Sequence, residues 1–120
     1  MTRLRRDRRL LGTDCAKEPK MTDVLEITTF SLASGRTVED FVAANSDINE
    51  YLKRRPGFRW RRILRRGDGS IIDIVAYDSL AHARAGAAGI TGEMADSPVH
   101  ATIDHSTVDW QLTTLIQHID

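Results

Sequence analysis

Two arginines and an aspartate flanking a glycine-rich turn, Gly67-Asp68-Gly69, are the first candidates for chemistry. Such a turn between two apolar runs predicts a β-hairpin. A two-residue loop, Asp68-Gly69, would put Arg62 on the same face of the sheet as Asp73, whereas a three-residue loop would put Arg61 there. An arginine beside an aspartate in a cavity lowers the pKa of the carboxyl group and orients a substrate. The alternative is a structural salt bridge between the two strands.

Three aromatic residues, Trp60, Tyr77 and Trp110, fall on three different predicted strands. Flat side chains from neighbouring strands would form a stacking wall for a flat ligand. The alternative is packing in the core or in an interface. Because the chain has only seven Phe, Trp and Tyr residues, a cluster of three would define a site.

Histidines are further candidates for a proton acceptor or a metal ligand. The chain has four of them, His82, His100, His105 and His118. No two have the spacing of a known metal motif, so we expect no metal site. His105 lies on the last predicted strand, where alternation of side chains lets it reach a cavity. For each histidine the alternative is a position on the surface or in an interface.

Two polar residues interrupt apolar patterns. Asn45 lies on the apolar stripe of a predicted helix, and Glu26 lies within the first predicted strand. A buried polar group needs a hydrogen-bond partner. Asn45 therefore either bonds to the sheet or the neighbouring backbone, or it points into a cavity and contacts a ligand. Glu26 has the same alternatives, and an arginine of the second strand is its expected partner.

The elements that would position these residues follow from hydrophobic periodicity and from turn residues. β-Branched residues predict a first strand over residues 23–33. Thr37 predicts the N-cap of a helix that continues to about Arg54, and Pro56-Gly57 ends that helix.

The second half of the chain begins with the hairpin, whose predicted strands cover residues 58–66 and 70–78. A helix rich in alanine and glycine is predicted over residues 80–90. A helical turn begins at Ser97-Pro98, where proline occupies its tolerated first position. Alternating residues then predict a long final strand over residues 102–119.

This order of elements, β-α-β-β-α-β, predicts a ferredoxin-like α+β fold, with a four-stranded antiparallel sheet and both helices on one face. The other face of the sheet is then uncovered. The last strand, at ~17 residues, also exceeds the usual length of roughly 5–6. We therefore expect a homodimer in which two sheets pack through their open faces into a dimeric α+β barrel.

Composition and charge restrict the class of protein. The chain has 120 residues, of which 41% are hydrophobic and 28% charged, as in one globular domain. Residues 1–20 carry seven basic and three acidic side chains, a net charge of +4, so residues 21–120 carry −4. We expect a basic tail over residues 1–20, with Met21 as a natural start, and one domain over residues 21–120. A nucleic-acid-binding or membrane-binding arm is the alternative for the tail.

A run of eight basic residues between Lys53 and Arg66 contains no acid. We expect it to face acidic residues elsewhere, because the acidic domain argues against binding to nucleic acid. Cys15 is the only cysteine, which excludes an internal disulfide and a cysteine-based metal site. No apolar run approaches the ~18 residues of a membrane span, and the N-terminus lacks the apolar region of a secretory signal. We expect a cytoplasmic protein without a membrane partner.

Short motifs follow one another in a characteristic order along residues 23 to about 118. They are Glu26-Ile27, Phe30, Gly35, Phe41, Arg55-Pro56-Gly57-Phe58, Arg61, Gly69, Asp73-Ile74-Val75, Tyr77-Asp78-Ser79, Ser97-Pro98 and Ile103-Asp104. In this order and spacing they resemble the dimeric α+β barrel proteins, in particular proteins similar to the antibiotic biosynthesis monooxygenases.

The resemblance implies a monooxygenase or related oxidoreductase that uses no cofactor and acts on a small aromatic or polyketide-like molecule held between helices and sheet. In such relatives the substrate anion itself supplies the electron to oxygen. They carry an Asn and a Trp four residues apart on the third strand, where this chain has Asp73 and Tyr77. These two residues and Arg61, which the resemblance favours over Arg62, are the predicted catalytic residues. The predicted substrate-binding residues are Asn45, Trp60, Glu26, His105 and Trp110.

The same fold group leaves other functions open. One alternative is a dimeric small-molecule binder or stress-type protein without catalysis, and another is a dimeric interaction module that works through its basic arm. Haem-degrading relatives need an Asn on the first strand, where this chain has Glu26, Thr28 and Thr29. Haem degradation is therefore not expected.

Overall fold

The computed structural model describes residue 20 and residues 22–120. Its elements are β1 (Val24–Leu32), α2 (Val38–Ala44), α3 (Ser46–Lys53), β2 (Phe58–Arg65), β3 (Ile71–Tyr77), α4 (Leu80–Thr91), the short 3-10 helix η3 (Pro98–Thr102) and β4 (Ile103–Thr114). The predicted basic tail, residues 1–20, lies outside the described residues except for Lys20, and so does Cys15.

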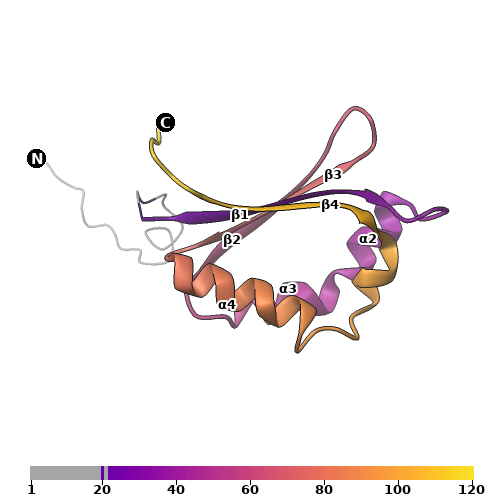
Figure 1. The fold of residues 1–120 in the computed structure, drawn as a ribbon, viewed down its shortest axis with the longest axis horizontal. Coiled ribbons are helices and arrows are strands. Elements are labelled where there is room, and N and C mark those ends of the chain that lie inside the picture. Colours follow the sequence, from indigo (N-terminus) through magenta and orange to yellow (C-terminus); the bar gives the residue numbers. More distant parts are fainter. Residues whose placement is uncertain (1–19, 21) are drawn as a thin grey trace, which may run out of the picture.

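The four strands form one antiparallel sheet in the order β2-β3-β1-β4. Helices α2, α3 and α4 lie on the same face of this sheet (Figure 1). No helix of the described residues covers the other face (Figure 1). The predicted ferredoxin-like α+β fold is confirmed, and the helix-side face of the sheet is where the candidate site lies.

The turn between β2 and β3 decides which arginine shares a face with Asp73. Ile63 pairs with Asp73 in the register of the two strands, which is the register of the three-residue loop. The amide of Gly69 donates to the carbonyl of Arg66 at 2.9 Å. Gly69 has a φ of 89°, which glycine adopts without strain. Arg61 therefore lies on the same face as Asp73, as the resemblance favoured.

The single helix predicted from Thr37 to Arg54 is wrong, because the chain forms two helices that meet at Asn45. Thr37 is the N-cap of α2, where its hydroxyl accepts from the amide of Asp40 at 3.1 Å. The side-chain amide of Asn45 donates to the carbonyl of Phe41 at 2.8 Å. In a continuous helix the carbonyl of Phe41 would accept a hydrogen bond from the backbone N–H of Asn45, four residues further on. The side chain competes for it and α2 ends there.

The last strand is shorter than the predicted range of residues 102–119. It spans Ile103–Thr114, and Thr102 belongs to the preceding 3-10 helix. Thr114 pairs with Val24, the first residue of β1. Residues after Thr114 therefore have no strand beside them with which to continue the ladder.

An irregularity in the pairing of β1 with β4 was not predicted. Thr29 pairs with Asp109, but Ser31 pairs with Asp104, so the register shifts between the two residues of β1. Residues 105–108 therefore bulge from the ladder. Such bulges bend a strand and re-aim its side chains, here beside the opening of the candidate site.

Large apolar side chains between the sheet and the helices form the core. They include Val24, Phe30, Phe41, Ile48, Leu52, Ile71, Val75 and Tyr77. The hydroxyl of Tyr77 occupies the place that a Cβ on Gly86 would need, and Tyr51 does the same at Gly89. Glycine at these two positions lets α4 approach the aromatic rings of the core.

Candidate active site

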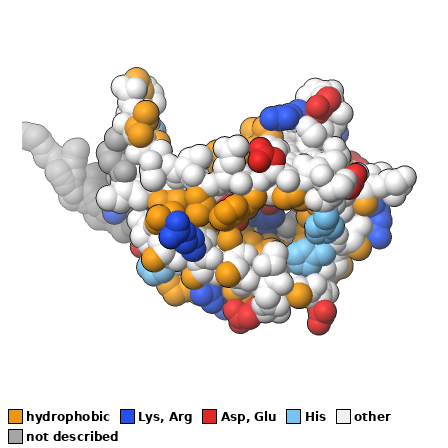
Figure 2. All heavy atoms as spheres, in the orientation of Figure 1, with side chains coloured by type: hydrophobic (Ala, Val, Ile, Leu, Met, Phe, Trp, Pro, Cys, Tyr) orange, Lys and Arg blue, Asp and Glu red, His pale blue; other side chains and the backbone are white. Residues whose placement is uncertain are grey.

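A cavity of about 520 Å³ lies between the helix-side face of the sheet and the helices. Its mouth appears in Figure 2 as a hollow with histidines on one side and basic atoms inside. Most of its surface is apolar. Polar side chains reach it from several elements: Glu26, Thr28, Asn45, Arg61, Asp73, Arg84, Thr91, His100, His105 and Trp110. An apolar cavity with a few converging polar groups is the usual form of a small-molecule site.

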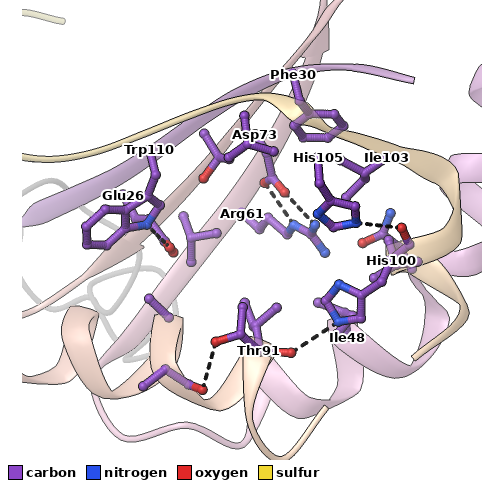
Figure 3. A pocket seen from close by; sticks show the side chains of 18 of the residues that line it. Glu26, Phe30, Ile48, Arg61, Asp73, Thr91, His100, Ile103, His105 and Trp110 are labelled. Atoms are coloured by element: carbon purple, nitrogen blue, oxygen red, sulfur yellow. Dashed lines mark hydrogen bonds and ion pairs between the residues drawn. The ribbon is translucent and has the colours of Figure 1, made fainter. Parts of the chain in front are cut away.

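Strands β2 and β3 bring Arg61 and Asp73 together in the cavity wall. Nε of Arg61 donates to Oδ1 of Asp73 at 3.0 Å and Nη2 donates to Oδ2 at 2.6 Å (Figure 3). Nη1 donates to Oδ1 of Asn49 on α3 at 2.8 Å. The two charged side chains are only 10% and 15% exposed. This bidentate pair is a strong, directional contact that joins the hairpin to α3.

Glu26 lies on β1 in the same wall and is only 6% exposed. Its Oε2 accepts from Nε1 of Trp110 at 2.6 Å (Figure 3), while Oε1 has no hydrogen-bond partner among the described residues. Burial raises the pKa of Glu26, and the indole hydrogen bond opposes part of the rise. The hydrogen-bond partner of Glu26 is Trp110 rather than the expected arginine of β2, because Arg61 directs its hydrogen bonds to Asp73 and Asn49. The charge of Arg61 still acts on Glu26 and lowers its pKa in part.

Asn45 combines the two alternatives that its position left open. Its side chain is 1% exposed, and its Nδ2 donates to the backbone carbonyl of Phe41. Its Oδ1 has no partner within the described part of the chain, and the residue lines the cavity. The same amide therefore ends α2 and leaves an acceptor at the cavity.

His100 and His105 lie together in the cavity wall, with ring centroids 6.2 Å apart. Nε2 of His105 lies 2.8 Å from the carbonyl oxygen of His100. Nε2 of His100 lies 3.2 Å and 3.0 Å from the carbonyl oxygens of Ile90 and Met94. Since carbonyls only accept, each ring carries a proton on Nε2. His100 was not among the predicted site residues, because a short 3-10 turn leaves no periodicity.

The other two histidines lie away from the cavity. His82 binds Asp78 at 2.6 Å, and His118 binds Asp120 at 2.8 Å. The hydrogen bond from His82 lowers the pKa of Asp78 below its usual range. Both histidines therefore match the surface alternative.

Tyr77 is completely buried, with 0% exposed, and it does not line the cavity. Its ring lies beneath Gly86 of α4, and its hydroxyl has no hydrogen-bond partner among the described residues. Burial raises the pKa of the phenol, which keeps the group neutral. This placement favours packing over contact with a ligand, because the core of the domain surrounds the ring.

Trp60 also lies apart from the cavity. It precedes Arg61, which lines the cavity, and alternate residues of a strand face opposite sides. Trp60 is therefore on the open face, where the guanidinium of Arg62 stacks on its ring at 4.2 Å. Of the three predicted aromatic residues, only Trp110 lines the cavity.

Helix α4 supplies cavity residues that were not among the predicted site residues. Arg84, Ala87, Ala88 and Thr91 all line the cavity. Their spacing of three, four and seven residues is that of one face of a helix, and this signal was present in the sequence. Asn49 was missed as well, although it lies one helical turn after Asn45.

Three residues of the basic run pair with acids from elsewhere in the domain. The pairs are Arg55 with Glu93 at 3.9 Å, Arg59 with Asp23 at 3.1 Å, and Arg61 with Asp73 at 2.6 Å. These contacts tie β2 and the preceding turn to three other segments. The run therefore contributes to the domain's internal ion pairs.

Within residues 20 and 22–120, no three His, Cys, Asp or Glu side chains are placed to hold a metal ion. In the same part of the chain, no helix is long and apolar enough to cross a membrane.

The sequence matches no family model and no curated protein. The fold nevertheless defines a class. It is the ferredoxin-like α+β fold that a cofactor-independent oxygenase and a monooxygenase of known structure share.

Three solved structures illustrate the likeness. SnoaB from Streptomyces nogalater, a cofactor-independent oxygenase, has a TM-score of 0.65 at 19% identity, over 82% of this chain and 97% of that chain. The ActVA-Orf6 monooxygenase of Streptomyces coelicolor, solved with nanaomycin D, has a TM-score of 0.64 at 17% identity, over 82% and 92%. Rv0793 from Mycobacterium tuberculosis has a TM-score of 0.62 at 12% identity, over 82% and 99%. At these identities the likeness is one of fold.

Proposed function

We propose that this protein is a monooxygenase-like oxidoreductase that acts, without a metal or organic cofactor, on a small aromatic or polyketide-like molecule in the cavity. The cavity is the observation that carries the proposal. Its volume of about 520 Å³ lies within the roughly 300–1,000 Å³ of small-molecule sites. Two proteins of the same fold, SnoaB and ActVA-Orf6, are an oxygenase and a monooxygenase.

The proposed reaction converts a ring methylene between phenolic rings to a carbonyl group. The deprotonated substrate gives electrons to dioxygen, both C–H bonds of the methylene break, one oxygen atom enters the carbonyl and the other leaves as water. Asp73, held by Arg61, provides a fixed charged wall. The ring of Trp110 provides a surface for stacking, and His105 lies at the mouth.

Oxygen uptake by the full chain, measured with a panel of anthrone-like and catechol substrates, tests this function. We expect uptake with at least one panel member, and a loss of about 100-fold in Asp73→Asn, because the weakened pair with Arg61 no longer fixes the cavity wall. The matched control is Asp96→Asn, which changes an exposed aspartate outside the cavity. Equal uptake by Asp73→Asn and the control would remove Asp73 from the mechanism.

The second candidate is a small-molecule binder or stress-type protein that performs no chemistry. The observation that favours it is the saturation of Arg61, whose three nitrogen atoms all bind Asp73 or Asn49. An oxygen-activating site gains from a cation free to stabilise the substrate anion. Tight binding of panel members with no oxygen uptake by any of them would favour this candidate.

We also propose a homodimer that forms through the open face of the sheet. Strand alternation puts a set of apolar residues there: Leu25, Ile27, Leu64, Ile72 and Ile74. A continuous apolar face of this kind is typical of an interface.

Sedimentation of the full chain tests the dimer. We expect a species of about twice the 13.5 kDa chain mass, and a monomer for Ile72→Lys. Val42→Lys is the control, because Val42 is exposed on α2. A wild-type chain that sediments as a strict monomer would overturn the proposal.

We further propose that residues 1–20 are a basic tail outside the domain of a cytoplasmic protein. The support is their charge of +4 against −4 for the rest of the chain. Deleting them should shift the melting temperature by less than about 3 °C. A larger loss would mean that the segment packs on the domain, and recovery of the protein outside the cytoplasmic fraction of cells would contradict the location.

A further inference from the structure

We propose that Glu26 is the proton acceptor of the cavity, and that Glu26 and Asn45 together select a ligand that donates two hydrogen bonds. This deepens the proposed function, on which it rests for the ligand class, a hydroxylated aromatic molecule. Asp73 on β3 was the predicted catalytic carboxylate, and this proposal places proton transfer on β1 instead.

The cavity wall carries two buried polar atoms without a partner, and both are acceptors. Among the described residues that line the cavity, these atoms are Oε1 of Glu26 and Oδ1 of Asn45. The two side chains are 6% and 1% exposed. A buried acceptor left unpaired is destabilising, so a ligand that donates to both atoms gains affinity that a ligand without donors lacks.

Asn45 presents its oxygen rather than its amide hydrogens because of the helix break. Nδ2 donates to the carbonyl of Phe41 at 2.8 Å. The reversed amide would put its oxygen against that carbonyl, where two acceptors repel. The backbone of α2 therefore fixes the orientation, and this end of the cavity offers an acceptor.

Trp110 is the positioning residue for Glu26. In the β1–β4 register Trp110 pairs with Thr28, two residues along the strand from Glu26, so the indole reaches diagonally to the carboxylate. Its Nε1 donates to Oε2 at 2.6 Å. One oxygen of the carboxylate is thereby held (Figure 3), and Oε1 has no hydrogen-bond partner among the described residues.

Glu26 and Asp73 are two carboxylates of one cavity in different surroundings. Both oxygens of Asp73 accept from the positively charged Arg61. Glu26 accepts only from a neutral indole, and burial raises its pKa. A carboxylate of higher pKa is the stronger base, so the surroundings assign proton transfer to Glu26. Asp73 instead provides a fixed negative charge that holds Arg61.

The proposed step is a proton transfer within the complex. The O–H bond of a phenolic or enolic ligand breaks, its electron pair stays on the ligand oxygen, and the proton forms a new O–H bond with Oε1 of Glu26. The ligand arrives neutral, because an anion would meet a carboxylate. The same wall disfavours an O-methyl ether or a fully oxidised carbonyl compound, neither of which donates.

Binding of a nitro-substituted naphthol that carries a second hydroxyl group, and of its fully O-methylated ether, tests the selection directly. We expect the wild-type chain to bind the naphthol at least about tenfold more tightly than the ether. The anion of the naphthol absorbs at longer wavelength than the neutral form, so proton transfer to Glu26 should appear as a red-shifted band on binding. Equal affinity for the two probes would overturn the selection.

Glu26→Gln keeps the shape of the side chain and removes its basicity. We expect it to abolish the red-shifted band and to lose the preference for the naphthol, while Glu39→Gln, at an exposed position of α2, keeps both. A red-shifted band that persists in Glu26→Gln would overturn the role of Glu26. Asn45→Ala should retain the band and reduce the preference alone.

Trp110→Phe separates positioning from packing. Loss of the indole hydrogen bond removes an interaction that lowers the pKa of Glu26, so the pH at which the red-shifted band appears should rise. An unchanged pH profile would show that Trp110 acts only as a wall.

The outcomes distinguish this inference from the proposed function. Binding that depends on Glu26, together with no oxygen uptake by any substrate of the panel, would overturn the monooxygenase and keep the proton acceptor. Oxygen uptake that Glu26→Gln leaves unchanged would do the reverse.

Discussion

Helix α4 meets the sheet in two different ways. On one side of the helix Tyr77 lies directly beneath Gly86, and no space remains between them. On the other side Ala87 and Ala88 face a cavity whose opposite wall includes Asp73. Neighbouring positions of one helix therefore border a packed core and a hollow.

The difference comes from the partner side chains of the sheet. An aromatic ring on β3 fills the space below the glycine, whereas four residues earlier β3 carries Asp73, which pairs with Arg61 rather than with the helix. Small residues on a helix thus permit either close packing or a cavity. The side chains of the facing strand determine which of the two forms. Four predictions test this contrast.

Arg61→Ala should have the largest effect. It leaves the carboxylate of Asp73 without its cation in a site where that side chain is 15% exposed. We expect the free energy of unfolding to fall by about 3 kcal/mol, measured by urea denaturation. Arg62→Ala is the control, because it removes only a stacking contact on the open face and should cost less than about 1 kcal/mol. Equal losses would mean that the pair contributes nothing specific to the cavity wall.

Gly86→Ala should destabilise the packed side by about 2 kcal/mol, since its Cβ collides with the hydroxyl of Tyr77. Gly67→Ala, with nothing near its Cβ position, should be close to neutral in the same urea titration. Adding Tyr77→Phe to Gly86→Ala should recover part of the loss, because it removes the colliding oxygen. If Gly86→Ala matches Gly67→Ala, the contact is not tight.

Ala87→Leu should fill part of the hollow side. We expect the naphthol probe to bind about tenfold more weakly, equivalent to roughly 1.4 kcal/mol. The free energy of unfolding should change by less than that, because the added side chain enters existing space. Ala85→Leu, on the exposed surface of α4, should leave binding unchanged. Undiminished binding in Ala87→Leu would place the ligand elsewhere.

The pH dependence of stability should show the smallest effect. The pKa of Glu26 is raised in the folded state above the ordinary value of 4.5. Between the pKa of Glu26 in the unfolded chain and its higher pKa in the folded chain, the folded chain binds more protons. The stabilising contribution of protonated Glu26 is therefore lost as the pH rises from the first pKa through the second. Urea titrations at several pH values should show wild-type stability falling relative to Glu26→Gln above about pH 4.5. Wild-type stability that rises relative to Glu26→Gln over this pH range would contradict the raised pKa.

Much of the fold could be predicted from local patterns. Neighbouring residues alone predict the N-cap at Thr37, the glycine turn after Arg66 and the alternation of the strands. The structure has these three features. The break at Asn45 could not be predicted, because a single side-chain hydrogen bond to Phe41 outweighs an otherwise helical pattern.

The candidate site was less predictable, because it depends on which distant residues meet. The loop length that places Arg61 beside Asp73 was left as one of two alternatives. Tyr77 and Trp60 gave the same aromatic signal as Trp110, yet one lies in the core and one on the open face. Burial and strand face separate the three rings, and neither quantity is local.

The loop Gly67–Gly69 has a consequence for how the chain tolerates change. All three of its residues are exposed and lie outside the cavity lining, so a substitution at Gly67 should be accepted readily, whereas at Gly69, with a φ of 89°, a side chain would strain the backbone. A change of length is different. Removing one residue moves every side chain of β2 to the opposite face and replaces Arg61 with Arg62 in the cavity wall. Insertions and deletions in this surface turn are therefore as damaging to the site as a substitution within it.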